Sequence, residues 1–127
     1  MEPDELLDKR YTYAIVGASR DESKYGHRVL ADLKGAGYKV VPVNPHADEV
    51  LGLTAYPSLK ELPETPDVVV CVVPPHVTEK VVEEAASLGV TKIWMQPGAS
   101  SEKAIEACEE HGIGCVHDTC VMVERKG

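Results

Sequence analysis

The sequence predicts a three-layer α/β domain with a doubly wound, mainly parallel sheet of about five strands and helices on both faces. Short apolar runs alternate with amphipathic segments about four times, and the connections between them are two to six residues long. This alternation requires right-handed crossovers between parallel strands. The run at residues 68–73 is apolar throughout, as expected for a strand covered on both faces. Because the sequence contains no internal repeat or linker, we expect a single domain over residues 1–127.

The chain opens with a predicted short helix, a buried strand and a tight turn. Residues 3–9 suit a short helix, because Pro is tolerated in a first helical turn and Leu6 and Leu7 can pack inward. Residues 13–16 are apolar and end in β-branched side chains, which predicts a buried strand. Gly17 ends this strand in a tight turn.

The next two elements are a long helix and a second strand. Apolar residues recur at intervals of three and four over residues 24–36, which predicts an amphipathic helix. Ser23 is the expected N-cap, and Gly37 is the expected C-terminal stop. The second strand lies at residues 39–43, and Pro42 places it near an edge of the sheet because Pro has no N–H to donate.

The middle of the chain predicts a short strand, one helical turn and the third main strand. Residues 51–56 are expected to add the short strand. Ser58 and Glu61 have the spacing of a capping box, which indicates a single turn of helix. The third strand, at residues 68–73, is ended by the proline pair at 74–75.

The last third of the chain continues the alternation of helices and strands. A helix that ends at Gly89 has one broad apolar face, and a fourth strand follows at residues 92–95. The face consists of Val77, Val81, Val82, Ala85 and Leu88. Ser101 is expected to cap a helix that turns Ile105 and Cys108 inward. The chain then ends with a strand at residues 113–116 and a short apolar segment at 121–123.

Composition and charge exclude several classes of function. The net charge of −8 argues against a nucleic-acid partner, because neutralising backbone phosphates requires a basic surface. No apolar run approaches the roughly 20 residues of a membrane span, and the N-terminus is acidic and unlike a signal peptide. We therefore expect a cytoplasmic protein with no membrane partner. The four cysteines lack C-x-x-C spacing and are expected to serve mainly as small apolar side chains.

Four loops are expected to form a ligand site. In parallel sheets, ligands bind outside the carboxyl ends of the strands, where the strand order reverses. A helix that starts after the first strand offers unpaired N–H groups and a positive dipole end, which suit a phosphate. The sequence therefore predicts a nucleotide-type ligand held by its phosphates. The candidate residues are Gly17, Ala18, Ser19, Arg20, Ser23 and Lys24 in the first loop, Asn44 and Pro45 in the second, Pro74 and Pro75 in the third, and Gln96, Pro97 and Gly98 in the fourth.

The first loop departs from the dinucleotide fingerprint G-x-G-x-x-G. Ser19 stands where the second glycine belongs, and the next glycine is Gly26. The acidic residue that binds a ribose hydroxyl is also absent, because the second strand ends at Asn44. These departures disfavour the alternative function, an NAD(P)-dependent oxidoreductase or a small epimerase-like enzyme. Arg20 and Lys24 suit phosphates, although a solvated surface loop explains each of them equally well alone.

Seven short blocks occur in the order seen in one protein family. They are Val16-Gly17-Ala18-Ser19-Arg20, Ser23-Lys24-Tyr25-Gly26, Val43-Asn44-Pro45, Tyr56-Pro57-Ser58-Leu59, Val73-Pro74-Pro75, Trp94-Met95-Gln96-Pro97-Gly98 and Asp118-x-Cys120. On these blocks the chain resembles the small stand-alone CoA-binding proteins. That family shares its Rossmann-like nucleotide-binding fold with the CoA domain of the succinyl-CoA synthetase α subunit.

The resemblance implies a coenzyme A or acyl-CoA site. It places the pyrophosphate near residues 19–24, next to Tyr25, and the adenine along Val43 and the shelf that begins at Val73. The pantetheine arm is then directed toward Gln96 and Pro97. The 3′-phosphate of CoA calls for cations, and the candidates are Arg20, Lys24, Arg28 and His46.

The sequence favours binding over catalysis and leaves enzymatic activity open. The related synthetases use a phosphorylated histidine on a further domain, so their ligase activity is not carried over by the resemblance. The cluster Cys115-x-His117-Asp118-x-Cys120 matches no standard zinc pattern, and we predict no metal site. By the same resemblance, Cys120 lies near the cleft and is a candidate for a mixed disulfide with the CoA thiol. A binding or regulatory module is expected, and a homodimer through a Val-rich edge is left open.

Overall fold

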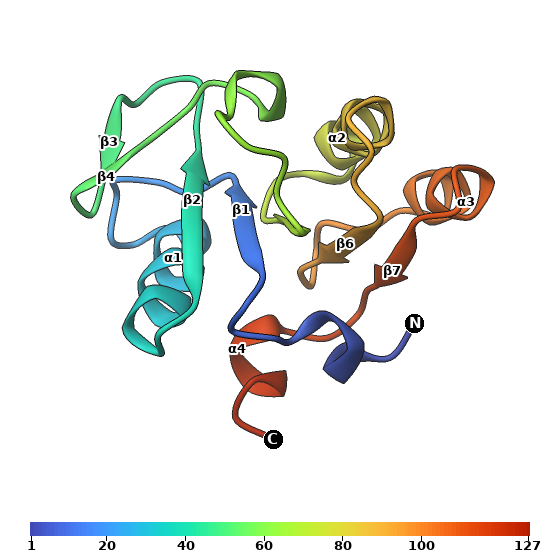
Figure 1. Cartoon of the computed structure of the whole chain (residues 1–127), viewed down its shortest axis with the longest axis horizontal. Helices are drawn as coiled ribbons and strands as arrows, with labels where there is room; N and C mark the ends of the chain where they lie inside the picture. The colour runs from blue at the N-terminus through green and yellow to red at the C-terminus, as the bar shows by residue number, and fades with distance from the viewer.

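The computed structural model describes residues 1–127 and contains a parallel five-stranded sheet between two layers of helices (Figure 1). The strand order is β2-β1-β5-β6-β7, and all four neighbouring pairs are parallel. The strands are β1 (Thr12–Val16), β2 (Lys39–Val43), β5 (Val68–Cys71), β6 (Lys92–Met95) and β7 (Gly114–Val116). The predicted fold class is confirmed, and β2, which contains Pro42, is an edge strand as expected.

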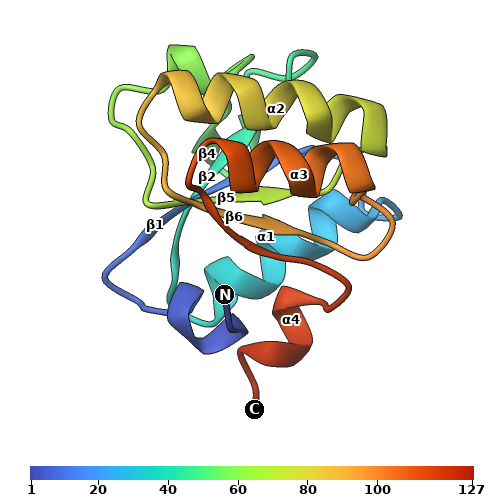
Figure 2. The same ribbon diagram turned by 90° about the vertical axis from the view of Figure 1, so that its right-hand side faces the viewer.

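The helices are divided between the two faces of the sheet. Figure 2 shows α2 and α3 above the sheet, with α1, α4 and the N-terminal turn below it. The helices are α1 (Tyr25–Gly35), α2 (Pro75–Ser87), α3 (Glu102–Glu110) and α4 (Val121–Glu124), with short 3-10 turns η1 (Pro3–Leu6) and η2 (Leu59–Glu61). None of these helices combines the length and the apolar composition needed to cross a membrane.

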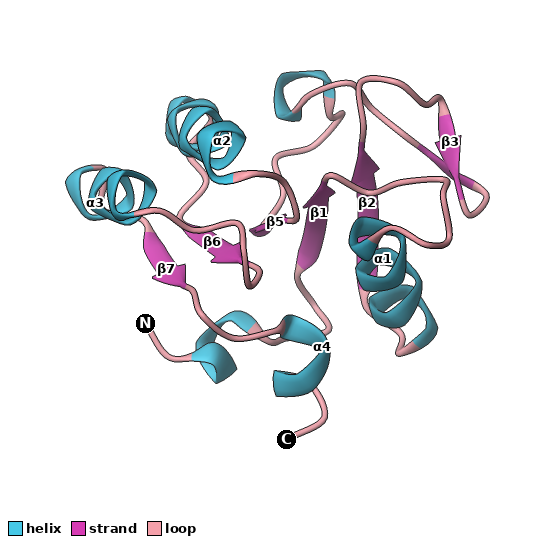
Figure 3. Ribbon diagram, turned by 180° about the vertical axis from the view of Figure 1, so that it is seen from behind, coloured by secondary structure: helices cyan, strands magenta, loops and turns pink.

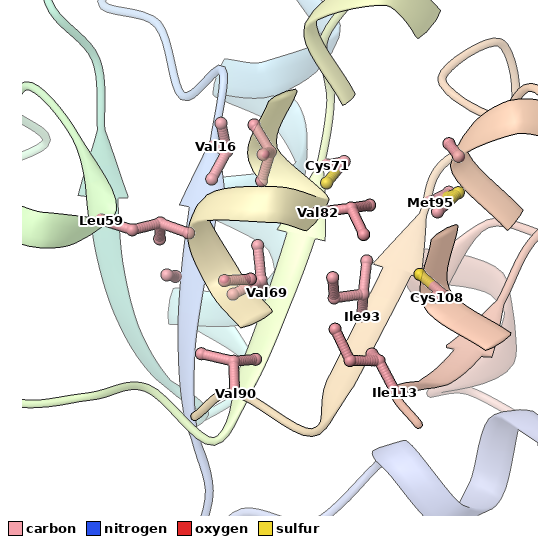
Figure 4. Packing of buried hydrophobic residues seen from close by; sticks show 14 of the residues in the cluster. Val16, Leu59, Val69, Cys71, Val82, Val90, Ile93, Met95, Cys108 and Ile113 are labelled. Atoms are coloured by element: carbon pink, nitrogen blue, oxygen red, sulfur yellow. The ribbon is translucent and has the colours of Figure 1, made fainter. Parts of the chain in front are cut away.

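Alternate residues along the strands pack into two separate hydrophobic cores, one on each face of the sheet. In β1, Ala14 and Val16 join the cluster of 16 buried residues under α2 and α3, while Tyr13 and Ile15 join the cluster of 14 on the other face. Figure 4 shows the first cluster, in which small β-branched side chains and sulfur atoms fill the space between sheet and helices. Each fully buried aliphatic side chain contributes roughly 1.5–3 kcal/mol of transfer free energy. The two cores therefore fix the sheet between its helical layers.

The strand order reverses beside β1. The chain passes from β1 outward to β2, and it then returns across β1 to form β5 on the other side. The expected strand at residues 51–56 is instead a small hairpin of β3 (Glu49–Val50) and β4 (Leu53–Thr54) beyond the β2 edge (Figure 3). Leu51 lies in its turn at a φ of 51°, and only Tyr56 bridges to Val43 of the main sheet.

Two expected elements are shorter than predicted. The helix expected at residues 3–9 is a 3-10 turn that ends at Leu6, which is fully buried. The strand expected at residues 68–73 ends at Cys71. The N–H of Val72 still donates to the carbonyl of Val16, but the chain then leaves the sheet plane.

Of the three predicted N-terminal helix caps, one is confirmed and two are wrong. Ser101 Oγ accepts a hydrogen bond from the N–H of Ala104 at 3.0 Å, as predicted. Ser23 is not the N-cap of α1, because its hydroxyl donates to Asp21 and Lys24 occupies the cap position without a side-chain hydrogen bond. Ser58 precedes η2 but makes no cap with its side chain. The hydroxyls of Ser23 and Ser58 therefore do not cap a helix, although the sequence pattern predicted that they would.

The junction between β1 and α1 requires two glycines. Gly17 has a φ of 100°, and a Cβ added there would lie 2.3 Å from the carbonyl oxygen of Val72. A Cβ added at Gly26 would lie 1.9 Å from the carbonyl oxygen of Gly17. The start of α1 is therefore in direct backbone contact with the turn that follows β1.

This contact predicts opposite effects for two substitutions in the same helix. Gly26→Ala should lower the free energy of unfolding by about 1–3 kcal/mol, because the added methyl group overlaps backbone that cannot move freely. Gly35→Ala is the matched control, since no atom lies within 4 Å of its added Cβ, and it should be neutral or stabilising by about 0.5 kcal/mol. Urea denaturation measures both, and equal losses would contradict the close contact.

Candidate functional site

Two adjoining hollows lie at the carboxyl edge of the sheet and share Val73 as a common wall. We call them the β2 hollow, of about 300 Å³, and the β6 hollow, of about 330 Å³. They meet beside β1 and β5, where the strand order reverses. The convergence of four strand ends on one edge, predicted from the sequence, is therefore confirmed.

The β2 hollow is mainly apolar and lies between the end of β2, η2 and α2. Its lining residues are Val16, Gly17, Val43, Asn44, Pro45, Pro57, Ser58, Leu59, Val73, Val77, Val81 and Glu84. The polar side chains at its wall include Ser58 and Glu84, and the Glu84 carboxylate accepts a hydrogen bond from the N–H of Leu59 at 3.4 Å. A flat, largely apolar group with a few polar edges suits such a hollow.

The β6 hollow is more open toward solvent and has prolines on two sides. Its lining residues are Tyr25, Val72, Val73, Pro74, Pro97, Gly98 and Ala99. Pro74 and Pro97 are exposed, so they form a rim. Because prolines have no N–H, this rim offers apolar contact to an extended chain.

The loop after β1 is pinned by side chains from its neighbours. Asn44 Nδ2 donates to the carbonyl of Ala18 at 2.8 Å, and Asn44 Oδ1 accepts from the N–H of His46 at 2.7 Å. On the other side, His27 Nδ1 lies 2.7 Å from the carbonyl oxygen of Ser19. Residues of β2 and α1 thus hold the loop in place before any ligand arrives.

The N-terminus of α1 faces this loop without a side-chain cap. The N–H groups of Tyr25 and Gly26 have no hydrogen-bond acceptor and remain available to an anion, whereas the N–H of His27 donates to the carbonyl of Lys24. Arg20 and Lys24 are exposed beside them, and neither takes part in any of the five ion pairs of the structure. The loop also contains Asp21, and the Ser23 hydroxyl and N–H that hydrogen-bond to its carboxylate lower its pKa. The cations are therefore balanced by acidic neighbours, and the uncapped helix end is the local feature most suited to an anion.

Nine of the sixteen predicted site residues line the hollows. They are Gly17, Tyr25, Val43, Asn44, Pro45, Val73, Pro74, Pro97 and Gly98. Four others, Ser19, Arg20, Ser23 and Lys24, lie on the loop and line neither hollow. The remaining three lie elsewhere: Ala18 is buried, Pro75 starts α2, and Gln96 is fully buried.

Sequence reasoning missed the wall that η2 and α2 contribute. Val77 and Val81 were assigned to the core by their helical spacing, yet both line the β2 hollow. Glu84, one turn further along α2, joins them there. Periodicity identifies the inward face of a helix, but it cannot separate the part that covers the sheet from the part that overhangs its edge.

A buried polar cluster lies behind the β6 hollow and consists of Tyr25, Gln96 and Cys120. We call it the Gln96 cluster. Gln96 is fully buried, and its Nε2 donates to the Tyr25 hydroxyl at 2.7 Å and to Cys120 Sγ at 3.3 Å. The Tyr25 hydroxyl donates to Cys120 Sγ at 3.0 Å. Gln96 Oε1 accepts from the N–H of Val121 at 2.8 Å, so both ends of the amide are used.

The cluster shifts the pKa values of two of its members in opposite directions. Burial raises the pKa of the Cys120 thiol, but the hydrogen bonds from Tyr25, Gln96 and backbone N–H groups of α4 outweigh it and leave that pKa below its usual value. Burial and the hydrogen bond to Cys120 raise the pKa of the Tyr25 hydroxyl. Cys120 is therefore the group in this cluster that most readily becomes an anion.

The other cysteines occupy different settings. Cys71 and Cys108 are buried in the core, as the sequence predicts, whereas Cys115 and Cys120 are half-buried. All four thiols are free. His117 pairs with Asp118 at 2.6 Å, and no group of three or more His, Cys, Asp or Glu side chains has an arrangement that suits a metal ion.

Besides the Gln96 cluster, two further contacts tie the segment that contains Cys120 to the rest of the domain. Trp94 Nε1 donates to the carbonyl of Thr119 at 3.0 Å. Arg125 of α4 forms a two-pronged ion pair with Asp32 of α1, at 2.6 and 2.8 Å. Two parallel N–H to oxygen contacts fix direction as well as distance. The ion pair therefore holds α4 against α1 and sets the position of Cys120.

Comparison with known proteins adds the identity of the family. The sequence model of a family described as a CoA binding domain matches residues 11–126. The chain is 33% identical over 119 residues to the uncharacterized protein YneT of Bacillus subtilis, covering 94% of this chain and 88% of that one. It is also 33% identical over 121 residues to the α subunit of the ADP-forming acetate–CoA ligase II of Pyrococcus furiosus, covering 87% of this chain and 26% of that subunit.

Solved structures agree with the sequence matches. A conserved hypothetical protein from Pyrococcus furiosus has a TM-score of 0.86 and 46% identity, covering 90% of this chain and 98% of that one. A dinucleotide-forming acetyl-coenzyme A synthetase 1 of Ca. Korarchaeum cryptofilum, solved with phosphate and ADP, has a TM-score of 0.73 and 31% identity. That match covers 83% of this chain but only 25% of the synthetase. The chain thus spans about a quarter of the synthetase and of the ligase subunit that it matches.

The ion pair between α4 and α1 predicts a pH-dependent stability difference. The hydrogen bond from Arg125 lowers the pKa of Asp32 in the folded protein. The ion pair therefore contributes fully to the free energy of unfolding above the unfolded pKa of 3.8, and this contribution is lost as the pH falls through the lower folded pKa. Asp32→Asn should therefore lower the Tm at pH 7, and the gap to the wild type should close below about pH 4.

Thermal unfolding followed by circular dichroism from pH 7 to pH 2.5 measures this gap. Glu106→Gln removes an exposed carboxylate of α3 and is the matched control, with the wild-type Tm expected at pH 7. A gap for Asp32→Asn that stays constant down to the lowest pH would show that the ion pair is not its source.

Proposed function

The chain belongs to the CoA-binding domain family, and from this membership we propose that it binds coenzyme A or an acyl-CoA along the two hollows. The observation that carries the proposal is the position of the uncapped α1 N-terminus beside a cleft whose two halves meet at Val73. An elongated ligand with a charged middle and two less polar ends matches this layout.

The diphosphate is assigned to the loop after β1. Gly17 lets the loop pack directly against the carbonyl of Val72, and the first N–H groups of α1 supply donors and a positive dipole end. Arg20 and Lys24 add exposed cations at the mouth of the loop. Because the nearby acidic residues offset these cations, we assign the main attraction to the backbone and a secondary one to the side chains.

The adenine is assigned to the β2 hollow, and the pantetheine arm to the β6 hollow. Val77 and Val81 provide an apolar wall of the first hollow, while Ser58 and Glu84 provide polar groups for the edge of a base. In the second hollow, Pro74 and Pro97 provide an apolar rim for an extended chain. This division accounts for why the two hollows differ in shape and share one residue.

We further propose a binding or regulatory role without catalysis of its own. The ligases and synthetases that the chain matches contain the equivalent region as about a quarter or less of their length. Their reactions belong to those complete proteins. In this chain the cleft supplies apolar walls and the N-terminal dipole end of α1, which suit binding, and the thiol nearest to it is that of Cys120 behind Tyr25.

Calorimetric titration with CoA, dephospho-CoA and NADP tests the proposal. CoA should bind, dephospho-CoA should bind more weakly because it lacks the 3′-phosphate, and NADP should bind least. The double variant Arg20→Ala with Lys24→Ala should weaken CoA binding by about tenfold or more, since charge-assisted hydrogen bonds are lost. Lys34→Ala, an exposed cation at the far end of α1, is the matched control and should bind like the wild type.

The three ligands also separate the competing interpretations. Tight binding of NADP without binding of CoA would favour the dinucleotide-dependent enzyme instead. Equal affinity for CoA and dephospho-CoA would show that the protein makes no favourable contact with the 3′-phosphate. The assignment of the diphosphate to the loop after β1 would still stand.

Filling the β2 hollow provides a second prediction. Val77→Trp places an indole in the space assigned to the adenine, so CoA binding should fall by at least tenfold while the fold remains intact. Glu106→Trp adds the same side chain to an exposed position on α3 and should leave binding unchanged. Unaltered affinity in the Val77→Trp variant, with native circular dichroism, would show that the base binds elsewhere.

A further inference from the structure

The Gln96 cluster lies at the end of the cleft that is assigned to the pantetheine arm. Tyr25 lines the β6 hollow, and its hydroxyl lies 3.0 Å from Cys120 Sγ, so the sulfur is one hydrogen bond behind the wall. The three members come from α1, the end of β6 and the residue before α4. They are brought together only by the fold, because Tyr25 and Cys120 are 95 positions apart in the chain.

CoA is proposed as the ligand on grounds that do not involve this cysteine. Membership of the CoA-binding domain family rests on the match over residues 11–126, and coenzyme A ends in a thiol at the tip of its pantetheine arm. A ligand whose diphosphate lies at the α1 N-terminus and whose arm runs along the β6 hollow brings that sulfur toward Tyr25. Two sulfur atoms would then approach each other across the wall of the hollow.

The environment of Cys120 Sγ is arranged to favour a thiolate. Both of its side-chain hydrogen bonds are accepted by the sulfur, from the Tyr25 hydroxyl and from Gln96 Nε2. Cys115 is a suitable comparison, because it is half-buried like Cys120. The pKa of Cys115 is also lowered, mainly by a hydrogen bond from Cys108. Cys115 lies within β7 and lines neither hollow.

We propose that Cys120 reacts by thiol–disulfide exchange with the disulfide form of the ligand that the cleft binds. The Cys120 thiolate attacks one sulfur of the symmetrical disulfide of CoA, and a bond forms between these two sulfurs. The original S–S bond breaks, and the second CoA leaves as a thiolate that takes a proton from water. One disulfide replaces another, so no further oxidant is needed, and any free thiol reverses the step.

This inference rests on the proposed function, because the cleft must first hold the nucleotide part of the disulfide. Binding raises the local concentration of the reactive sulfur beside Cys120, which accelerates exchange relative to a free disulfide. The protein would then hold CoA covalently when CoA disulfide is abundant and release it when thiols are abundant. The same cleft thereby distinguishes the oxidised ligand from the reduced one.

Intact-mass analysis with peptide mapping tests the exchange on the full chain. Reduced protein, freed of reductant, is incubated with CoA disulfide or, separately, with glutathione disulfide at the same concentration and pH 7.5. We expect one CoA adduct, located on Cys120, that forms at least tenfold faster than the glutathione adduct and disappears on addition of dithiothreitol. Cys115→Ser should form the adduct at the wild-type rate, and Cys120→Ser should not form it.

Tyr25→Phe provides a variant that keeps the thiol. Removing the hydroxyl donor should raise the pH at which the exchange rate reaches half its maximum, a readout that a general loss of stability would not move. An unchanged pH profile would overturn the role of Tyr25 in holding the thiolate.

Calorimetry with CoA separates failure of this inference from failure of the proposed function. If CoA binds and no adduct forms on Cys120, exchange is excluded and the binding function stands. If Cys120 reacts equally fast with both disulfides, the cleft does not direct the reaction and the inference is wrong. If CoA does not bind at all, the proposed function fails, and with it the cleft-directed exchange.

Discussion

The contact between the backbone of the first turn and the start of α1 is the constraint on which the rest of the structure depends. Gly17 and Gly26 allow two stretches of main chain to approach within distances that no side chain permits. Because α1 starts so close to the sheet, its free N–H groups lie at the strand ends instead of above the helical layer. The hydrogen bonds of Asn44 and His27 then fix the loop from both sides. The proposed anion site is thus built mainly from backbone, with the exposed cations Arg20 and Lys24 beside it.

The same residues that stabilise the fold also shape the cleft. Val16, Val43 and Val81 belong to the buried cluster under α2 and α3, and they continue into the wall of the β2 hollow. The strand order leaves a gap above β1 and β5 because the connections leave in opposite directions. Val73, which follows the end of β5, lines both hollows and separates them. The site is therefore a consequence of the core and the topology together.

The architecture was predictable because each strand has a continuous apolar pattern and each helix a regular one. The limits of that prediction are equally specific. Ser23 and Ser58 have the composition of helix caps, but Asp21 competes for the first and the second stands before a turn of only three residues. The Gln96 cluster depends on a contact across 95 positions, which no local pattern encodes. Val77 was correctly predicted to face inward, yet only the three-dimensional structure shows that it faces the cleft.

Gln96 uses both polar atoms of its amide to connect α1, the end of β6 and the start of α4. Its oxygen orders the first residue of α4, while its nitrogen contacts a hydroxyl that forms part of the cleft wall. An amide in this position is rigid, because rotating it by half a turn would set donor against donor and acceptor against acceptor. Tyr25 is therefore joined through Gln96 to the first residue of the last helix. A group that bound in the β6 hollow would contact a side chain whose hydrogen bonds reach the C-terminal segment.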